Sequence, residues 1–282
     1  MNHENLDEPT SNNTSSKVVK TFQISLSQSG ISIQGSNSAT NIDTYMVKVI
    51  ELLPQVHVWP SSVLLSAYLL AHPSKFRDKV VFDLGAGCGL TSIAASLAGC
   101  KHVVCSERND EEALIENLQS VVALNKQELL ISPDASIEVI PFSWGDHEDS
   151  NHPIFQQQQK DHDYNSQTID IILGSDVFYS SEDIDPILFV VYRLMRLNPE
   201  LIFYAAYQQR SISRSMAPHL SKFGMKAEVV ESAEFLHPYH LQAMREEDIC
   251  SDHEDQFIEK FSSSYSFENL ESVTLIKVSN LQ

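Results

Sequence analysis

Short apolar runs alternate with longer amphipathic segments from residue 80 to the end of the chain. The short runs are rich in Val, Ile and Phe, which favours buried strands, whereas the longer segments repeat apolar residues every three or four positions, which favours helices. This alternation is typical of an α/β fold, a doubly wound and mostly parallel sheet. The expected strands are 80–84, 102–106, 137–141, 169–173, 201–206, 226–230 and 273–278, and the expected helices are 90–98, 109–125, 183–197 and 213–223.

The N-terminal region follows a different pattern. Residues 1–16 are polar and rich in Asn, Ser and Thr, so we expect a disordered tail. Residues 21–26 and 30–34 alternate apolar and polar side chains across a short Ser-Gln-Ser-Gly connection, which predicts an added β-hairpin over 17–50. The main domain is then 51–282, and it begins with a helix after Pro60.

Two stretches interrupt the alternation of strands and helices. Residues 145–168 contain four consecutive glutamines among Asp, His and Asn, a composition that predicts a solvated loop without a catalytic group. Residues 231–270 form an acidic insertion, either a partner-facing segment or a simple solvated surface.

Three glycines stand at alternate positions after the first strand of the main domain: Gly85, Gly87 and Gly89. Such a turn can bend sharply and lie close to a ligand because no Cβ intervenes. The spacing differs from the G-x-G-x-x-G of dinucleotide sites, where the third glycine lets a helix pack near a pyrophosphate. The pattern therefore predicts a bound ligand other than NAD.

Carboxylates accompany the first two strands of the main domain. Asp83 stands two residues before Gly85, where a dinucleotide enzyme would bring its pyrophosphate, so the site suits a cationic or amino-bearing group. Glu107 ends the next strand, 18 residues after Gly89, and an acid there can accept hydrogen bonds from both ribose hydroxyls. S-adenosylmethionine, a positively charged nucleoside without phosphate, fits both carboxylates.

The net charge of the chain indicates which kind of macromolecule it could bind. Its 282 residues include 38 acidic and 19 basic side chains, a formal charge of −19. No run of Lys or Arg could follow a phosphate backbone, so direct nucleic-acid binding is disfavoured. A basic polypeptide would be attracted to such a surface.

Neither the cysteines nor the His-Pro-Tyr-His segment at 237–240 has the spacing of a zinc site, so no metal is expected. The N-terminus lacks a secretory apolar region and no apolar stretch is long enough to cross a bilayer, so we expect an intracellular protein without membrane contact. Buried thiols in a reducing compartment are expected at Cys88, Cys100, Cys105 and Cys250.

Four ordered motifs resemble those of the seven-β-strand methyltransferase family 16. They are the segment 58–62 (VWPSS), the glycine strand 80–90, the segment 142–145 (FSWG) and the segment 174–179 (GSDVFY). The resemblance covers roughly residues 50–230 and the final strand. It implies a seven-stranded Rossmann-like methyltransferase sheet whose last two strands form an antiparallel hairpin at one edge.

The resemblance also implies roles for individual residues. Gly85, Ala86 and Gly87 would pass under the methionine part of the cofactor, Glu107 would hold the ribose, and Trp144 would lie beside the adenine. Glu107 departs from the family, because many members have Asp there. With the residues of the glycine turn, the expected cofactor-binding set is Trp59, Asp83, Gly85, Ala86, Gly87, Gly89, Glu107, Trp144 and Ser175.

Asp176 and Tyr179 match the D-x-x-Y of lysine-directed members, where the acid positions the substrate amine, and they are the expected catalytic pair. An arginine acceptor would instead need carboxylates that hold a planar guanidinium, and Asp176 suits either acceptor. Glu182, Asp183 and Asp185 follow at a helix start, where acids commonly serve only as helix N-terminal charges, with contact to the substrate as the alternative because loops after strand ends carry function in such folds.

The expected function is that of an S-adenosylmethionine-dependent protein methyltransferase. Its acceptor would be a Lys or Arg side chain of a basic protein in the cytoplasm or nucleus, with histone arginine among the candidates and a chaperone or protein complex as a further partner. Two alternatives stay open at this point. One is a catalytically weak cofactor-binding module that acts by docking, and the other is a small-molecule methyltransferase.

Overall fold

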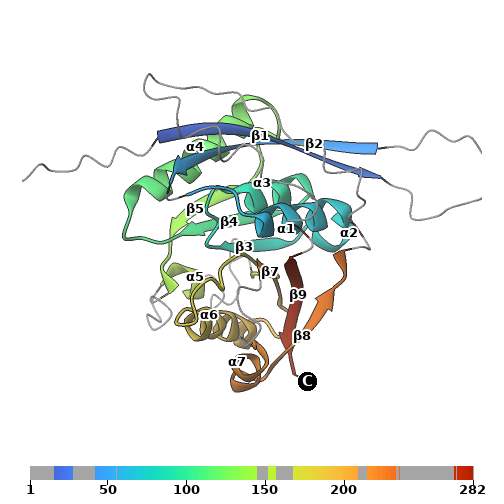
Figure 1. Cartoon of the computed structure of the whole chain (residues 1–282), viewed down its shortest axis with the longest axis vertical. Coiled ribbons are helices and arrows are strands. Elements are labelled where there is room, and N and C mark those ends of the chain that lie inside the picture. Colours follow the sequence, from blue (N-terminus) through green and yellow to red (C-terminus); the bar gives the residue numbers. More distant parts are fainter. Residues whose placement is uncertain are drawn as a thin grey trace, which may run out of the picture.

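A seven-stranded mixed sheet forms the centre of the protein (Figure 1). The computed structural model describes residues 16–27, 42–54, 56–144, 152–156, 168–208, 215–232, 235, 270 and 272–281. The strand order is β5-β4-β3-β6-β7-β9-β8. The strands are β3 (Val80–Leu84), β4 (His102–Glu107), β5 (Ile137–Pro141), β6 (Ile171–Ser175), β7 (Ile202–Gln208), β8 (Met225–Val230) and β9 (Val273–Asn280).

The direction of the strands confirms the expected topology. β5, β4, β3, β6 and β7 are parallel, whereas β9 is antiparallel to both β7 and β8. The antiparallel edge hairpin is therefore present, and all seven strands lie within a few residues of their predicted bounds. Strands buried on both faces need continuous apolar runs, which is why β3 was evident from sequence.

Helices cover both faces of the sheet (Figure 1). Buried side chains of α1 and α3 form one apolar cluster with the N-terminal strands, and those of α6 and α7 form a second cluster across the sheet. The helices are α1 (Pro60–Ala71), α2 (Pro73–Phe76), α3 (Leu90–Leu97), α4 (Glu112–Gln127), α5 (Pro153–Gln156), α6 (Ile184–Leu197) and α7 (Ala217–Lys222).

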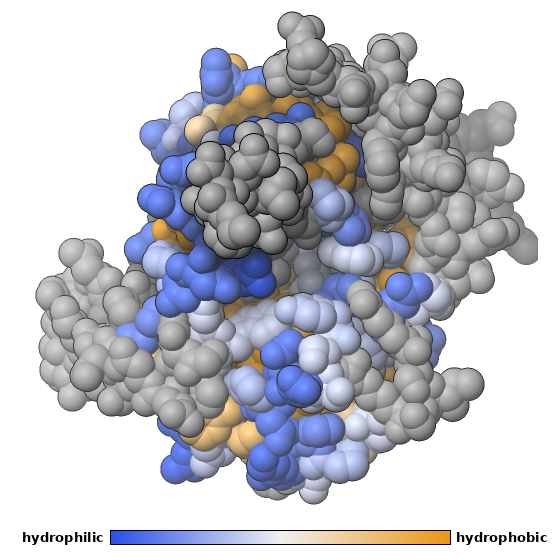
Figure 2. Space-filling model, turned by 60° about the vertical axis from the view of Figure 1, so that its left-hand side comes forward, coloured by the Kyte–Doolittle hydropathy of each residue, from blue (hydrophilic) through white to orange (hydrophobic). Residues whose placement is uncertain are grey.

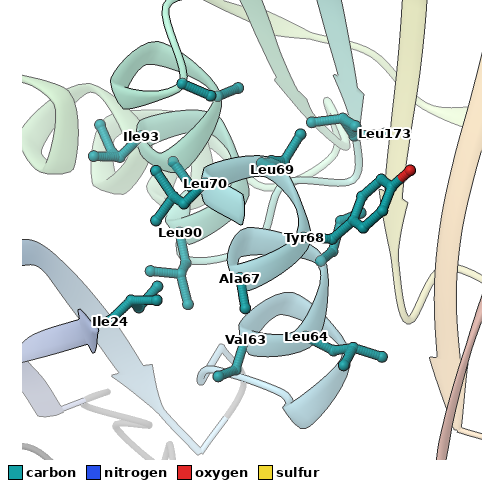
Figure 3. Close-up of a cluster of buried hydrophobic side chains, with 14 of the residues drawn as sticks. Ile24, Val63, Leu64, Ala67, Tyr68, Leu69, Leu70, Leu90, Ile93 and Leu173 are labelled. Atoms are coloured by element: carbon teal, nitrogen blue, oxygen red, sulfur yellow. The ribbon is translucent and has the colours of Figure 1, made fainter. Parts of the chain in front are cut away.

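Helix α1 is apolar on all sides because it lies between other layers. Every residue from Ser61 to Leu70 is buried. Figure 3 shows Leu90 and Ile93 of α3, Ile24 of the N-terminal hairpin and Leu173 of β6 around this helix. A helix without a polar face requires such complete cover. The fold therefore fixes the start of α1, and with it the segment that precedes Pro60.

The N-terminal hairpin is present, but its second strand differs from the prediction. β1 (Ser16–Ser27) pairs antiparallel with β2 (Ile42–Leu53). The strand expected over 30–34 lies outside the described residues, and its predicted pairing with 21–26 is wrong because residues 43–48 of β2 pair there. Residues 42–53 are rich in Ile, Val, Tyr and Leu, which favours a strand, and they pair with the whole length of β1. The hairpin extends to residue 53, beyond the expected boundary at 50.

The loop expected to be solvated at 145–168 is wrong in part. Residues 152–156 are described and contain α5, and both Ile154 and Phe155 are fully buried. The ring centroids of Phe142 and Phe155 are 6.3 Å apart, and the Arg193 guanidinium lies 3.8 Å from the Phe155 ring centre. Two apolar residues in a polar stretch were enough to anchor it to the core. The expected tail at 1–16 and acidic insertion at 231–270 lie almost entirely outside the described residues.

The described surface is largely polar. On the face shown in Figure 2, hydrophilic residues cover much of that surface and hydrophobic ones form separate patches. In the described part of the chain, no helix is long and apolar enough to cross a membrane. No group of three or more His, Cys, Asp or Glu side chains within the same described ranges could hold a metal ion.

Candidate active site

The carboxyl ends of the parallel strands meet at one edge of the sheet. β3 and β6 are neighbours there, and strand order changes direction between them, since β4 and β5 follow on one side and β7 on the other. Ligands of open α/β sheets bind at such a point. A cavity of about 560 Å³ opens at this place, with walls from the segment before α1 and from the loops after β3, β4, β5 and β6.

The glycine turn after β3 forms the floor of the cavity. Gly85 and Gly87 have φ values of 68° and 56°, in the left-handed region that favours glycine. A Cβ on Gly85 would meet the Trp144 ring at 3.4 Å, whereas a Cβ on Gly87 would have open space around it. The Ala86 amide donates a hydrogen bond to the Ser106 carbonyl at 2.8 Å, which fixes the turn to β4. Gly85, Ala86 and Gly87 thus line the cavity, and their contact with the cofactor stays a prediction.

Asp83 does not line the cavity, contrary to the expectation that it meets the ligand directly. Its side chain is fully buried below the turn, and Oδ2 accepts hydrogen bonds from the hydroxyls of Thr91 at 2.5 Å and Ser92 at 2.6 Å. Burial raises the pKa of the Asp83 carboxyl to about 6, and the two hydroxyls oppose that rise. The physical reason is register: Asp83 pairs within the sheet with Cys105 and Leu173 and precedes the strand end.

Gly89 also lies outside the cavity wall. Its φ is 74° and it precedes α3, where a Cβ would lie 3.1 Å from Leu118 and 3.5 Å from Val121 of α4. Gly89 therefore permits close packing of the turn on α4, and its assignment to direct cofactor contact is not supported.

Glu107 lines the cavity at the end of β4. Its Oε2 accepts a hydrogen bond from the Gly87 amide at 2.9 Å, and Oε1 accepts one from the Arg108 amide at 3.0 Å. The carboxylate thus lies directly beside the glycine turn, and its contact with a ribose stays a prediction.

Aromatic residues approach the cavity from two sides. Trp144 packs over Gly85, and its ring centre lies 5.8 Å from that of Tyr179. In the segment before α1, the rings of Trp59 and His57 are 4.1 Å apart. Trp59 and Tyr179 are 40% and 50% exposed, so both rings have area available to a ligand. Burial raises the pKa of the Tyr179 hydroxyl, and the nearby Asp183 carboxylate raises it further.

Asp176 is placed one residue beyond β6, beside Ser175 in the cavity wall. Its φ of 56° is left-handed, a conformation that Asp tolerates better than most residues. The Asp176 amide donates to the Ala206 carbonyl at 2.7 Å, and the Gln208 amide approaches Oδ1 at 3.5 Å, so the end of β7 orients the residue. Strain of this kind concentrates at functional sites.

Further polar residues of the wall were not predicted from sequence. Arg108 bridges Asp110 at 3.1 Å and Glu111 at 2.7 Å, and all three line the cavity. The sequence feature that could have predicted them is their position directly after Glu107, the acid expected to bind the ribose. Asp183, for which the sequence leaves open a helix charge or a substrate contact, also lies in the wall. Asp185 instead bonds to His219 and Lys222, which lower the pKa of its carboxyl, with Lys222 the larger influence.

His57 was missed because only its neighbours in the VWPSS motif had a recognisable pattern. Half-buried in the wall, it hydrogen-bonds to the Pro54 carbonyl. Burial lowers the pKa of the imidazole, an effect that the charges of Glu51 and Asp176 partly oppose and that of Lys20 reinforces. The ring is therefore mostly neutral near pH 7.

Family comparison agrees with this geometry. The family model described as lysine methyltransferase matches residues 54–222, more than half of the chain. The chain belongs to this methyltransferase family. The matched range contains the glycine turn, Glu107, Trp144 and Asp176, whereas the N-terminal hairpin precedes it.

Individual curated methyltransferases are similar to the chain over about half to two thirds of its length. Histone-arginine methyltransferase METTL23 of Mus musculus is 31% identical over 194 residues, 69% of this chain and 68% of the relative. The protein N-terminal and lysine N-methyltransferase efm7 of Schizosaccharomyces pombe is 29% identical over 60% of this chain and 59% of its own length. Protein-lysine methyltransferase METTL21E of Mus musculus is 33% identical over 46% and 48%, respectively.

The cofactor of this methyltransferase is S-adenosylmethionine, and the cavity suits it. A volume of about 560 Å³ is in the range of small-molecule sites, and the left-handed glycines leave the floor open. Arg108 is the only Lys or Arg among the described residues that line the cavity, and it already forms ion pairs with Asp110 and Glu111. A site of this charge favours a cationic nucleoside over a phosphorylated one.

The described cysteines take no part in disulfides. Cys88 and Cys105 are buried, and burial raises the pKa of both thiols, while that of Cys100 rises to about 12. These thiols are therefore unreactive at neutral pH. Cys250 and the 237–240 segment lie outside the described residues.

Proposed function

We propose that the protein methylates a Lys or Arg side chain of a basic protein, with histone arginine among the acceptors. The observation that carries the proposal is Asp176, a buried carboxylate in the cavity wall whose left-handed backbone is fixed between β6 and β7. Such a group is suited to orient a nitrogen nucleophile.

The charge around the cavity supports a basic acceptor. Glu107, Asp110, Glu111, Asp176 and Asp183 all line it, against one arginine. With a formal charge of −19 for the whole chain, this opening attracts a positively charged segment and disfavours nucleic acid.

The chain would hold the cofactor between the glycine turn, Glu107 and the rings of Trp59 and Trp144. When bound, S-adenosylmethionine supplies an electrophilic methyl group. The protein then has to bring a nitrogen lone pair to within about 3 Å of that carbon and exclude water. Asp176 orients the acceptor nitrogen, Tyr179 covers the entrance, and the proton released by the nitrogen leaves through the polar opening.

Both acceptor types have support. METTL23 is named a histone-arginine methyltransferase, and efm7 acts on lysine and on protein N-termini. The rim formed by Asp110 and Glu111 already accommodates a guanidinium, that of Arg108, which is compatible with an arginine acceptor. A cytoplasmic or nuclear location stays a prediction.

The test uses the full chain with methyl-tritiated S-adenosylmethionine, incubated with core histones and separately with cell lysate. We expect label in protein, recovered after hydrolysis as methyl-lysine or methyl-arginine, and none with the Asp176→Asn variant. Label found only in small metabolites would replace the proposal with small-molecule methylation. Cofactor binding without any labelled product would indicate a docking module.

A further inference from the structure

A buried ion pair within the N-terminal hairpin includes the carboxylate that binds the cavity wall. Lys20 of β1 and Glu51 of β2 approach to 2.9 Å between Nζ and Oε2, and their side chains are 7% and 1% exposed. The other oxygen of Glu51, Oε1, accepts a hydrogen bond from the Val58 amide at 2.8 Å. Val58 stands between His57 and Trp59, all three of them wall residues.

The chain also turns back sharply between the hairpin and this wall. Leu52 and Val56 exchange two backbone hydrogen bonds of 2.8 Å each. The turn carries the chain directly from the last residues of β2 into the wall. The position of the wall therefore depends on what holds the end of β2.

The other end of the wall segment is fixed by α1. Both the amide and the hydroxyl of Ser62 donate to the Trp59 carbonyl, at 3.0 and 2.8 Å. Because α1 is buried on all sides, it anchors this end firmly. Between the Leu52–Val56 turn and Trp59, the Val58 amide is held by a side chain of the hairpin.

We propose that Glu51, oriented by Lys20, is a positioning residue for cofactor binding: it holds the His57–Trp59 wall against the cavity, so that hairpin docking and cofactor affinity are coupled. The proposal rests on the cavity being the cofactor site. It gives the hairpin, which precedes the matched family range of 54–222, a part in building that site.

Two double variants separate the hydrogen bond from the ion pair. Lys20→Met/Glu51→Leu replaces the pair by apolar side chains, a change that buried pairs often tolerate, but it removes the acceptor of the Val58 amide. Lys20→Met/Glu51→Gln removes both charges and keeps an amide oxygen for Val58. A matched control, Lys79→Met/Asp170→Asn, removes the Lys79–Asp170 pair, which lies directly before β3 and β6 and outside both the hairpin and the cavity wall, and keeps an amide oxygen for the Val80 amide.

The measurement is titration calorimetry with S-adenosylhomocysteine, together with thermal unfolding. We expect the leucine double variant to bind about 5- to 10-fold more weakly with a Tm within about 5 °C of the wild type. The glutamine double variant and the control should stay within about twofold of the wild-type affinity. Equal affinities for all four proteins, or equal losses in both Lys20 variants or in the control, would overturn the proposal.

Amide hydrogen exchange on the wild-type protein gives an answer that does not depend on variants. Coupling is reciprocal, so bound S-adenosylhomocysteine should slow exchange at Val58 and along β1 and β2 by at least about threefold. Unchanged hairpin exchange in the saturated protein would contradict the coupling. A wild-type protein that binds no S-adenosylhomocysteine would instead remove the cavity assignment, and neither experiment involves the methyl acceptor.

Discussion

Two aspartates at neighbouring strand ends have opposite environments. Asp83, the fourth residue of β3, is fully buried and bonded to two hydroxyls of α3. Asp176, one residue past β6, lies in the cavity wall with a left-handed backbone. Residues within a central parallel strand are covered on both faces, whereas residues just past its end face the ligand crevice. A shift of two positions along a strand thus separates a structural acid from a candidate catalytic one.

The same comparison divides the cavity into two functional parts. In the proposed function, the turn after β3, with Glu107 beside it, is the cofactor part, and the turn after β6 is the acceptor part. Changes in the first should alter cofactor affinity, and changes in the second should alter the rate of transfer. Four predictions test this division.

Gly87→Arg should have the largest effect. The new side chain would enter the cofactor part of the cavity, so we expect no measurable heat with S-adenosylhomocysteine and no methyl transfer. The fold should persist, since a Cβ there meets nothing within 4 Å and the left-handed backbone costs about 1–2 kcal/mol.

Gly224→Arg is the matched control for that variant. Gly224 has a φ of 65°, an equally open surrounding and a position between α7 and β8, outside the cavity. It should lose similar stability and keep full cofactor binding. Normal binding by Gly87→Arg would refute the placement of the cofactor over the turn.

Asp176→Asn should lower the transfer rate by at least about 100-fold while cofactor affinity changes by less than about threefold. Asparagine keeps the shape and tolerates the left-handed backbone, so the loss reports the charge that orients the acceptor. Single-turnover kinetics and calorimetry measure the two quantities. Asp78→Asn is the control, because Asp78 is also left-handed, with φ of 63°, but is exposed before β3. A retained rate would place Asp176 with Asp83, among the structural acids.

Asp83→Asn should stabilise the protein at neutral pH. The folded pKa of about 6 exceeds the reference value of 3.8, so the folded state holds its proton more tightly and stability falls as pH rises from about 4 to 6. Above pH 6 the ionised carboxyl costs about 3 kcal/mol. Urea unfolding should show the variant more stable by about 2–3 kcal/mol at pH 7.5, with the gap shrinking toward pH 4.

The cofactor affinity of the Asp83→Asn variant tests whether this carboxylate also contacts the ligand. Asp83 lies outside the cavity wall and acts on the ligand only through long-range electrostatic interaction. The affinity of the variant for S-adenosylhomocysteine should therefore stay within about fivefold of the wild-type value. A loss larger than 100-fold would mean that the carboxylate meets the ligand directly.

Glu107→Asp should have the smallest effect. Shortening the side chain by one methylene weakens its contact with the Gly87 amide, so calorimetry should show cofactor affinity reduced by about two- to fivefold. The maximal transfer rate should not change, because the acceptor part is untouched. A lower rate at saturating cofactor would break the separation of the two parts.

Local pattern was sufficient to identify the sheet and the ligand turn. Val80–Leu84 is apolar except for one acid, and alternating glycines follow it, which together indicate a buried strand and a close approach to a ligand. The D-x-x-Y segment led to Asp176 and Tyr179, both of which line the cavity. These features were predictable from the sequence because each of them lies within a few consecutive residues.

Other features depended on contacts between distant residues. The partner of β1 is 42–53 and not 30–34, and nothing within residues 21–34 indicates that choice. The burial of Ile154 and Phe155 depends on the space between β5 and α6. His57 belongs to the wall because Glu51, Pro54 and Asp176 surround it.

The sequence by itself determined the strands of the central sheet, its longer helices, the glycine turn and the family, because periodicity and backbone freedom are local properties. Only the tertiary structure decided that Asp83 is buried, that Gly89 serves packing, and that Arg108 and Asp183 border the cavity. Those outcomes depend on whether each residue lies within a strand or just past its end. They also depend on which residues of the neighbouring strands lie next to it. Desolvation and charge effects depend on the distances between residues that are far apart in the sequence, and the order of residues alone does not give those distances.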